Sequence, residues 1–508
     1  MPSDATAAPE PQQRLPALAE TFGERAADAA DGPLDRFLAE PDCWMSLRLW
    51  VGSEALPGLA ADRRRLRQAI DRDIAAIDAL LTDQVNAIIH APRFLALEAA
   101  WRGLLYLLGA AGEARNVKIK LLQISWNELV RDVERAPDFD QSEIFDKVYS
   151  NEFGIAGGEP FGLLLGDYEV SHRRSREHPT DDVTALNSVA QVAAAAFAPF
   201  VVGCRPDLFG LGDFRELSSD IDLDEVFRQA EYTRWRSLRN AEDCRFVGIC
   251  LPRILLREPW RDATLRRTRF RFQEQRELTA DNGYLWGNAG FAFAGVAIRA
   301  FIESGWFAEI RGAPRGVEGG GLVGNLPVDH FTTDRAEIGF KRPLDIALAD
   351  RLERVLSDWG FIPLSPTELT PYGVFFSNQS IQLPVAYSTA TASMNAKLSS
   401  MLQYMLCIGR FAHVIKVLGR DRVGSFTTPE ECQSMLQRWV TNYVTSSASA
   451  SVETRIRYPL REAQVRVTEL PGKPGSYKTD IHLRPHLQLD DIATGIRLTT
   501  ELAPQRAA

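Results

Sequence analysis

The segment GGGLVG, from Gly319 to Gly324, matches the G-x-G-x-x-G spacing of loops that hold the phosphates of a dinucleotide. Such a loop works because a helix begins directly after the glycines and presents free backbone N–H groups to the phosphate. Here the next residues are NLPVDHF, and Pro327 favours an extended chain. The sequence also lacks a phosphate-binding loop that ends in Gly-Lys-Ser or Gly-Lys-Thr. We therefore expect a turn at this segment, and a nucleotide-binding enzyme is the less favoured alternative.

Four acidic residues, Asp220, Asp222, Asp224 and Glu231, occupy positions 1, 3, 5 and 12 of a calcium-binding EF-hand loop. The sixth position of that loop must be glycine for its sharp turn, and here it is Glu225. The residues that follow have a helical pattern, which would separate the carboxylates. We therefore predict that Asp222 or Asp224 caps the start of a helix.

Two histidines, His482 and His486, are four residues apart, but Pro485 excludes the helix that would align them as zinc ligands. His413 lies in an apolar helical segment, so we predict a packed or interface histidine. Neither the G-x-S-x-G motif of serine hydrolases nor the H-E-x-x-H motif of zinc proteases occurs. Because no motif assigns a catalytic residue, a metal or a cofactor, we predict a component of an assembly rather than an enzyme.

The composition is typical of a soluble protein with several domains. The 508 residues are 45% hydrophobic and 25% charged, and the net charge of −9 disfavours binding to nucleic acid through its phosphates. Six scattered cysteines, with no C-x-x-C pair, fit a reducing compartment. The most apolar runs, 192–202 and 290–298, are shorter than the ~20 residues that span a bilayer. We therefore expect a cytoplasmic protein without membrane insertion.

The N-terminal part divides into an arm and a helical region. Residues 1–33 lack apolar periodicity and predict a disordered arm. Residues 34–60 predict a linker, in which the apolar segment CWMSLRLWV at 43–51 could form a strand. Residues 61–116 predict a helical hairpin: Asp62 can cap the first helix, Pro92 ends it, and a second helix runs through Trp101. The first helix has one apolar stripe, formed by Leu66, Ile70, Ile74, Ile77, Leu81, Val85 and Ile88.

Residues 117–390 predict a mixed α/β core, because short apolar runs alternate with amphipathic helices. The predicted strands are 119–124, 161–166, 200–203, 246–251, 307–310, 361–364 and 374–376. The predicted helices are 182–198, 223–240, 286–304 and 344–358. This alternation favours a sheet that is at least partly parallel.

Residues 391–508 predict C-terminal helices and a β-hairpin. A long helix covers 395–418, with Gly419 suited to the position after its end, and a second helix begins at a Thr428 cap followed by Pro429. The segments 463–470 and 476–489 alternate apolar and polar residues on either side of the turn PGKPG. Residues 492–502 could add a further strand. On the hairpin, Val465 and Val467 share one face, as do Tyr477, Ile481 and Leu483.

Several long blocks of the sequence resemble the large subunit of the type VI secretion contractile sheath. The resemblance runs from about residue 34 to residue 502. Its N-terminal blocks are FLALEAAWRGLLYL at 94–107, GGEPFGLLLGDYE at 157–169, AAAAFAPFVV at 193–202, LPRILLREPW at 251–260, YLWGNAGFAFA at 284–294 and GGGLVGNLPV at 319–328. Its C-terminal blocks are RFAHVIKVLGRDRVGSF at 410–426 and LPGKPGSYKTDIHLRPHLQL at 470–489. The segment at 43–58 departs from the family, where it is usually more polar.

This resemblance implies a structural role without a cofactor. The large subunit would pair with a small sheath subunit, and further copies would stack as a helical sheath around an inner tube protein. The sheath, attached to a baseplate, would contract to propel the tube, and a recycling ring ATPase would act through the small subunit. Strands of neighbouring protomers would add to one another's sheets. The main alternative, more similar to this interpretation than a nucleotide-binding enzyme, is a sheath protein of another contractile injection machine, such as a phage-like tail.

Three groups of residues are candidates for these contacts. We expect Leu66, Ile70, Ile77 and Trp101 to pack on the small subunit. A cluster of cations in and after the long C-terminal helix is a candidate for contact with the tube or another protomer (Arg410, Lys416, Arg420 and Arg422). The hairpin is a candidate link between protomers through Val465, Val467, Tyr477, Ile481 and Leu483.

Overall fold

The computed structural model describes residues 32–502, except 55, 156, 177, 218–220, 262–269, 275–282, 308, 314–318, 332–338, 422–427, 448–450, 470–476 and 487–495. Its described part is a mixed α and β structure, as the sequence predicts. The chain divides into two compact units, Met1–Leu95 with Pro259–Gly283 and Ala96–Glu258 with Tyr284–Ala508. All but the last two residues of the predicted arm at 1–33 lie outside the described residues.

The first unit contains the helices α2 (Pro33–Ala39), α3 (Cys43–Val51), α4 (Leu56–Ala60) and α5 (Arg63–Ile89). The predicted cap of α5 is confirmed, because the Asp62 side chain accepts a hydrogen bond from the N–H of Arg64 at 2.8 Å. The carboxylate of Glu274, also in this unit, pairs with His90 at 2.9 Å and accepts a hydrogen bond from the N–H of Trp260 at 2.7 Å.

The strand prediction at 43–51 is wrong, because this segment forms helix α3. Asp42 caps its start by accepting from the N–H of Trp44, and Gly52 ends it in a positive-φ conformation. Its apolar residues also suit a helix: the Trp50 ring lies 5.2 Å from the Phe37 ring at an angle of 49°, and its indole N–H donates to Asp73 on α5 at 2.9 Å. Local caps and helical contacts therefore prevail over β-propensity.

The second unit is built on a six-stranded sheet of order β1-β2-β3-β9-β10-β6. Four strands are parallel: β1 (Leu164–Val170), β2 (Phe200–Cys204), β3 (Val247–Leu251) and β9 (Ile362–Pro366). The fifth strand, β10 (Gly373–Phe375), pairs antiparallel with β9, and the sixth, β6 (Leu322–Val323), pairs antiparallel with β10. The short pairs β4 (Ile254–Arg257) with β5 (Leu285–Gly287) and β7 (Asp329–His330) with β8 (Phe340–Lys341) lie outside this sheet.

Helices cover both faces of the parallel strands. Helix α10 (Asp182–Ala196) packs with Phe200 and Val202 of β2 in the main hydrophobic core. Residues Val201 and Gly203 of the same strand face the segment around Gly290, where α13 (Gly290–Ser304) begins. Because all five residues of β2 are buried, the strand is covered on both sides. The remaining core helices are α7 (Trp126–Arg135), α8 (Glu143–Phe145), α9 (Asn151–Phe153), α11 (Leu223–Arg228), α12 (Thr233–Arg239) and α14 (Asp350–Asp358).

Two strand predictions of the core are not met among the described residues. The segment 119–124 forms no strand, and its Leu121 and Leu122 are exposed. The segment 307–310 forms none at its described positions either, although Ile310 is buried. Both segments are apolar, but a strand exists only where a neighbouring strand supplies hydrogen bonds.

The structure divides two of the predicted helices and starts others later than predicted. The helix at 223–240 breaks at Gln229, whose backbone is extended, into α11 and α12. The helix at 286–304 begins only at Gly290, because Leu285–Gly287 forms β5. The helix at 395–418 becomes α15 (Ala390–Ser399) and α16 (Leu402–Asp421). Gly419 lies inside α16 rather than after its end, so that prediction is wrong.

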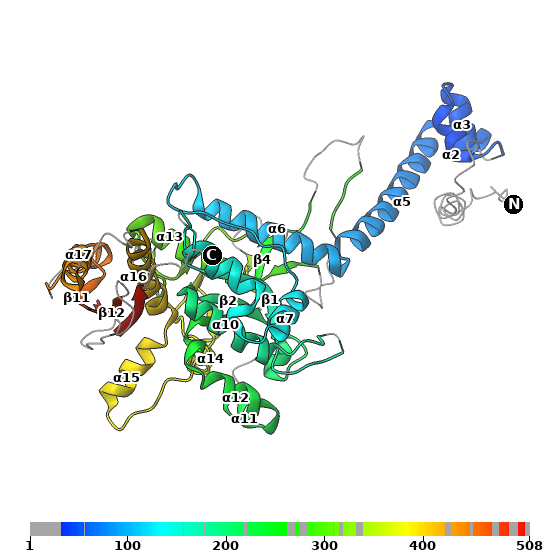
Figure 1. The fold of residues 1–508 in the computed structure, drawn as a ribbon. Helices are drawn as coiled ribbons and strands as arrows, with labels where there is room; N and C mark the ends of the chain where they lie inside the picture. The colour runs from blue at the N-terminus through cyan, green and yellow to red at the C-terminus, as the bar shows by residue number, and fades with distance from the viewer. Residues whose placement is uncertain are drawn as a thin grey trace. The chain divides into compact units, whose positions relative to one another are not determined.

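The C-terminal part forms a separate antiparallel sheet of β11 (Leu460–Glu469), β12 (Tyr477–Pro485) and β13 (Ile496–Leu502). The predicted hairpin is confirmed, with Val465 opposite Ile481 and Ala463 opposite Leu483. Helix α17 (Pro429–Thr441) packs on β11 (Figure 1), and α18 (Val452–Arg457) precedes the strand. The Thr428 cap of α17 is also confirmed, since its hydroxyl accepts from the N–H of Glu431 at 3.3 Å.

Candidate protein-interaction surfaces

The glycine segment at 319–324 forms a turn that leads into strand β6, as expected. The guanidinium group of Arg299, on α13, donates to the carbonyl oxygens of Gly320 and Leu322, both at 2.7 Å. A Cβ atom at Gly321 would clash with the backbone of Phe375 and Arg311. The glycines therefore permit close packing of backbone against backbone, and no helix begins after them to hold a phosphate.

The acidic and histidine candidates have structural roles. Asp222 caps α11 by accepting from the N–H of Glu225 at 3.1 Å, and Asp224 accepts from the indole of Trp359 at 2.6 Å. Asp220 lies outside the described residues. His413 is buried in α16 and hydrogen-bonds the carbonyl oxygen of Ala196 at 2.9 Å. Burial lowers the pKa of His413 to about 4.

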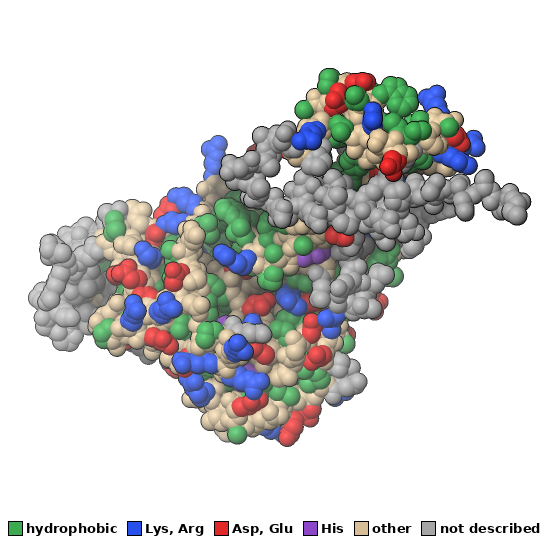
Figure 2. Space-filling model, turned by 90° about the vertical axis from the view of Figure 1, so that its right-hand side faces the viewer, with side chains coloured by type: hydrophobic (Ala, Val, Ile, Leu, Met, Phe, Trp, Pro, Cys, Tyr) green, Lys and Arg blue, Asp and Glu red, His purple; other side chains and the backbone are tan. Residues whose placement is uncertain are grey.

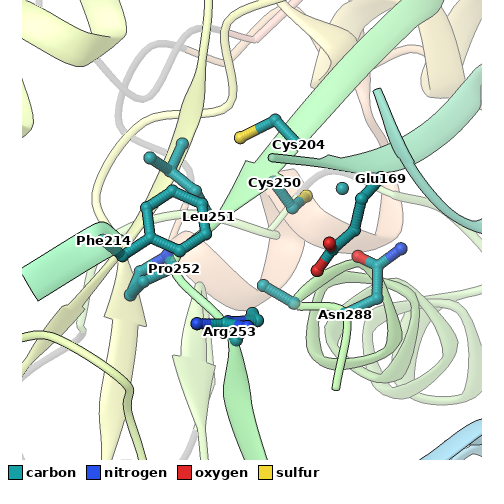
Figure 3. A pocket seen from close by; sticks show the side chains of 10 residues that line it. Glu169, Cys204, Phe214, Cys250, Leu251, Pro252, Arg253 and Asn288 are labelled. Atoms are coloured by element: carbon teal, nitrogen blue, oxygen red, sulfur yellow. The ribbon is translucent and has the colours of Figure 1, made fainter. Parts of the chain in front are cut away.

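A small cavity lies at the carboxyl ends of β1, β2 and β3, where a parallel α/β sheet commonly binds its ligand (Figure 3). Glu169, Cys204, Cys250 and Asn288 line it, and the carboxylate of Glu169 lies beside the Asn288 amide. Its volume is only about 10 Å³. This cavity has room for one water molecule and for no organic ligand.

Two of the four candidate cations, Lys416 and Arg420 on α16, make extensive contacts within the chain. The Nζ atom of Lys416 lies 5.0 Å from the ring centre of Tyr149 and 4.9 Å from those of Phe153 and Phe197. One turn later, Arg420 donates to the carbonyl oxygens of Glu152, Ile155 and Gly158 at 3.3, 3.0 and 3.4 Å. Both side chains thus fix α16 to the segment that contains α9.

Of the other two candidate cations, the structure describes Arg410 but not Arg422. The guanidinium group of Arg410 lies 5.5 Å from the ring centre of Phe301, and burial lowers the pKa of Arg410. Arg422 lies outside the described residues. Contact of this cluster with a tube or another protomer therefore remains a prediction, and for Lys416 and Arg420 it would come in addition to their contacts within the chain.

Helix α6 (Pro92–Ala111) passes from the first unit into the second, and there it packs on α13 through two glycines. A Cβ atom at Gly103 would clash with the Phe291 ring, and one at Gly295 would clash with Tyr106. Glu98 forms an ion pair with the buried Arg257 at 2.9 Å. These contacts fix one side of α6 to the α/β core.

The opposite side of α6 exposes four large apolar residues. They recur at helical spacing and are 51–63% exposed (Leu97, Trp101, Leu105 and Leu108; hereafter the α6 stripe). Among the described helices, α6 is also the one that is long and apolar enough to cross a membrane. This is weak evidence for a membrane span, because the core helices of soluble proteins meet the same criteria. Because Gly103 and Gly295 allow α6 to pack closely on the α/β core, the exposed stripe is better explained by a protein partner than by a membrane.

The three candidate residues on α5, Leu66, Ile70 and Ile77, are half-buried. Other members of the same stripe are more open: Ile74 is 46% exposed and Ile88 is 53% exposed. Packing of α5 and α6 as a hairpin remains a prediction. The stripe on α5 nevertheless leaves apolar area uncovered along the helix.

The candidate hairpin residues are all buried within the chain. Val465, Val467, Tyr477, Ile481 and Leu483 are at most 7% exposed and belong to the main hydrophobic core. Their side chains therefore pack the C-terminal sheet against the core of the same chain. A link to a neighbouring protomer would have to use backbone groups at a strand edge.

Comparison with known proteins identifies the family. A model of the tail sheath N-terminal domain of EvpB/VC_A0108 proteins matches residues 71–382, and one of their tail sheath gpW/gp25-like domain matches 391–502. The chain is also 39% identical over 444 residues to the type VI secretion system sheath protein TssC1 of Pseudomonas aeruginosa, which covers 87% of each chain. The chain belongs to the type VI secretion sheath family. Proteins of this sheath family are structural subunits rather than enzymes.

The surface of this sheath protein is mixed in charge on the face shown in Figure 2. Described Lys and Arg side chains are interspersed there with Asp and Glu. Such a mixture offers no continuous basic surface to a polyanion on that face. It suits contacts in which each partner supplies both signs of charge.

Sequence reasoning missed two features that the structure shows. The first is the cage of aromatic rings around Lys416. The i, i+4 spacing of Phe145, Tyr149 and Phe153 could have predicted a row of rings on one helix face. In the structure, the Tyr149 ring lies 4.9 Å from that of Phe145 and 4.8 Å from that of Phe153. The second is a pair of glutamines on α17, Gln433 and Gln437, that bind the backbone of β11. No local pattern marks the second feature, because its partners are about 30 residues away.

Proposed function

We propose that this chain is the large subunit of a contractile sheath that pairs with a small sheath subunit, polymerises around an inner tube in the cytoplasm and contracts to propel it. The observation that carries the proposal is the match to two successive sheath domains over residues 71–382 and 391–502. Contraction needs no cofactor, because each protomer can exchange one packing arrangement for another of lower free energy.

The exposed α6 stripe supports the pairing step. Four large apolar side chains on one side of a helix are costly in water, and a partner that covers them gains about 25 cal/mol for each Å² buried. We assign this stripe to the small subunit, together with the apolar residues of α5 around Ile77. The baseplate and the recycling ATPase remain partners that the family implies.

The test is co-expression of the full chain with the small sheath subunit of the same secretion system, followed by electron microscopy. We expect a stable heterodimer and hollow tubes. Well-folded chains that form neither heterodimer nor tubes would contradict the proposal. A phage-like sheath protein would instead form tubes without any small subunit, and a nucleotide-binding enzyme would bind ATP or NAD in a titration.

A matched pair of variants tests the assigned surface. Replacing Leu105, which is 63% exposed in the α6 stripe, with Asp should abolish the heterodimer while the chain stays soluble. Leu121→Asp is the control, because Leu121 is 70% exposed but lies outside the stripe. Equal binding of the small subunit by both variants would place the interface elsewhere.

A further inference from the structure

Strand β11 is an edge strand of the C-terminal sheet, yet the chain itself covers its outer edge. In the order β11-β12-β13, no other described strand pairs with the outer side of β11. Such an edge presents rows of free N–H and C=O groups, which can pair with a strand of another molecule. Here, Val465 and Val467 direct their N–H groups outward, and both groups are bonded.

The covering groups are two glutamine side chains one helical turn apart on α17. The Oε1 atom of Gln437 accepts from the N–H of Val465 at 2.8 Å, while its Nε2 atom donates to the carbonyl oxygen of Ala463 at 3.1 Å. The Oε1 atom of Gln433 accepts from the N–H of Val467 at 3.1 Å. One primary amide thus bonds both a donor and an acceptor of the strand, as the backbone of a neighbouring strand would.

The start of the same edge is closed by backbone contacts. The N–H of Leu460 donates to the carbonyl oxygen of Tyr443 at 3.2 Å, and the N–H of Thr445 donates to the carbonyl oxygen of Leu460 at 2.9 Å. Val444 and Leu460 form a parallel bridge. The outer edge therefore has partners within its own chain at Leu460, Ala463, Val465 and Val467.

We propose that Gln433 and Gln437 guard the β11 edge, so that a strand of a second copy of this chain cannot add there unless it displaces them. Gln433 is exposed and Gln437 is half-buried, so both side chains can rotate away from the strand without opening the core. The guard rests on contacts within one chain and does not depend on the sheath proposal. Failure of tubes to form would therefore leave it untouched.

The test is the double variant Gln433→Ala with Gln437→Ala in the full chain, or in its complex with the small subunit if that forms. Alanine favours the helix, so α17 should stay folded. At low protein concentration, hydrogen exchange resolved by residue should become about two- to tenfold faster at Val465 and Val467. Gln464 and Arg466, whose N–H groups point to β12, should stay protected.

The second readout is the molar mass measured by light scattering. The double variant should form larger species as its concentration rises, while Ser434→Ala, on an exposed position of the same helix, should behave like the wild type. The proposal is overturned if exchange at Val465 and Val467 is unchanged. It is also overturned if exchange rises but the mass does not, because the amides would then be local contacts without a guarding role.

Discussion

The ammonium group of Lys416, on α16, lies 4.9 Å from the ring centre of Phe153, on α9. Tyr149 and Phe197 complete the ring cage, and the Tyr149 hydroxyl lies 3.4 Å from the same nitrogen. Burial lowers the pKa of Lys416 to about 8. Its first role is therefore to fasten α16 within the chain.

Charge reversal at Lys416 should destabilise the fold and not merely an interface. Lys416→Glu places a carboxylate against three ring faces and should lower the free energy of unfolding by about 3 kcal/mol. Lys416→Met fills the same space without a charge and should stay within about 1.5 kcal/mol of the wild type. Urea denaturation measures both, and a stable Glu variant would contradict the cage.

The same side chain should make stability rise with pH above 8. Its pKa in the folded chain, about 8, is below the ordinary lysine value near 10.4. Between these values the unfolded chain binds more protons, so this group's contribution to the free energy of unfolding increases with pH. The increase should be absent in Lys416→Met, as a comparison of the two pH profiles would show.

His413 should make the fold sensitive to acid. Its folded pKa of about 4 is below the ordinary histidine value near 6.5, so the unfolded chain binds the extra proton first as the pH falls. The contribution of His413 is complete above pH 6.5 and is lost towards pH 4, by about 3 kcal/mol. Thermal denaturation of wild type and His413→Asn across this range is the measurement; parallel profiles would refute the assignment.

Two glycines on α6 should respond oppositely to alanine. Gly103→Ala places a methyl group against the Phe291 ring and should cost about 1–3 kcal/mol. Gly109→Ala meets no atom within 4 Å and should stabilise the helix by up to about 1 kcal/mol. Similar melting temperatures for both variants would show that α6 does not pack closely on α13.

Proline substitutions in β11 should distinguish the two sides of the strand. The N–H of Val467 bonds Gln433 rather than β12, so Val467→Pro removes an edge contact and not a bond between the two strands. Arg466→Pro removes a donor directed to β12 and should destabilise the hairpin more. Circular dichroism and tube formation with the small subunit would rank the two variants; an equal loss would contradict the register.

The sequence alone determined the features whose causes are local. The alternation at 463–469 and 477–483 predicts the hairpin and its buried face, and Asp62, Asp222 and Thr428 predict three helix starts, since a cap bonds backbone two or three residues away. Long blocks shared with the sheath family also determined the function class before any fold was known.

Only the tertiary structure decided features whose partners are distant in sequence. The break between α15 and α16 is fixed where the N–H of Leu402 donates to Asn378 at 2.9 Å and that of Ser380 donates to Ser400 at 3.1 Å. The apolar segment at 119–124 forms no strand, because none of the described strands pairs with it to complete its hydrogen bonds. Likewise, periodicity places Gln437 on a helix face, but only the packing of α17 on β11 turns its amide into a partner for a strand edge.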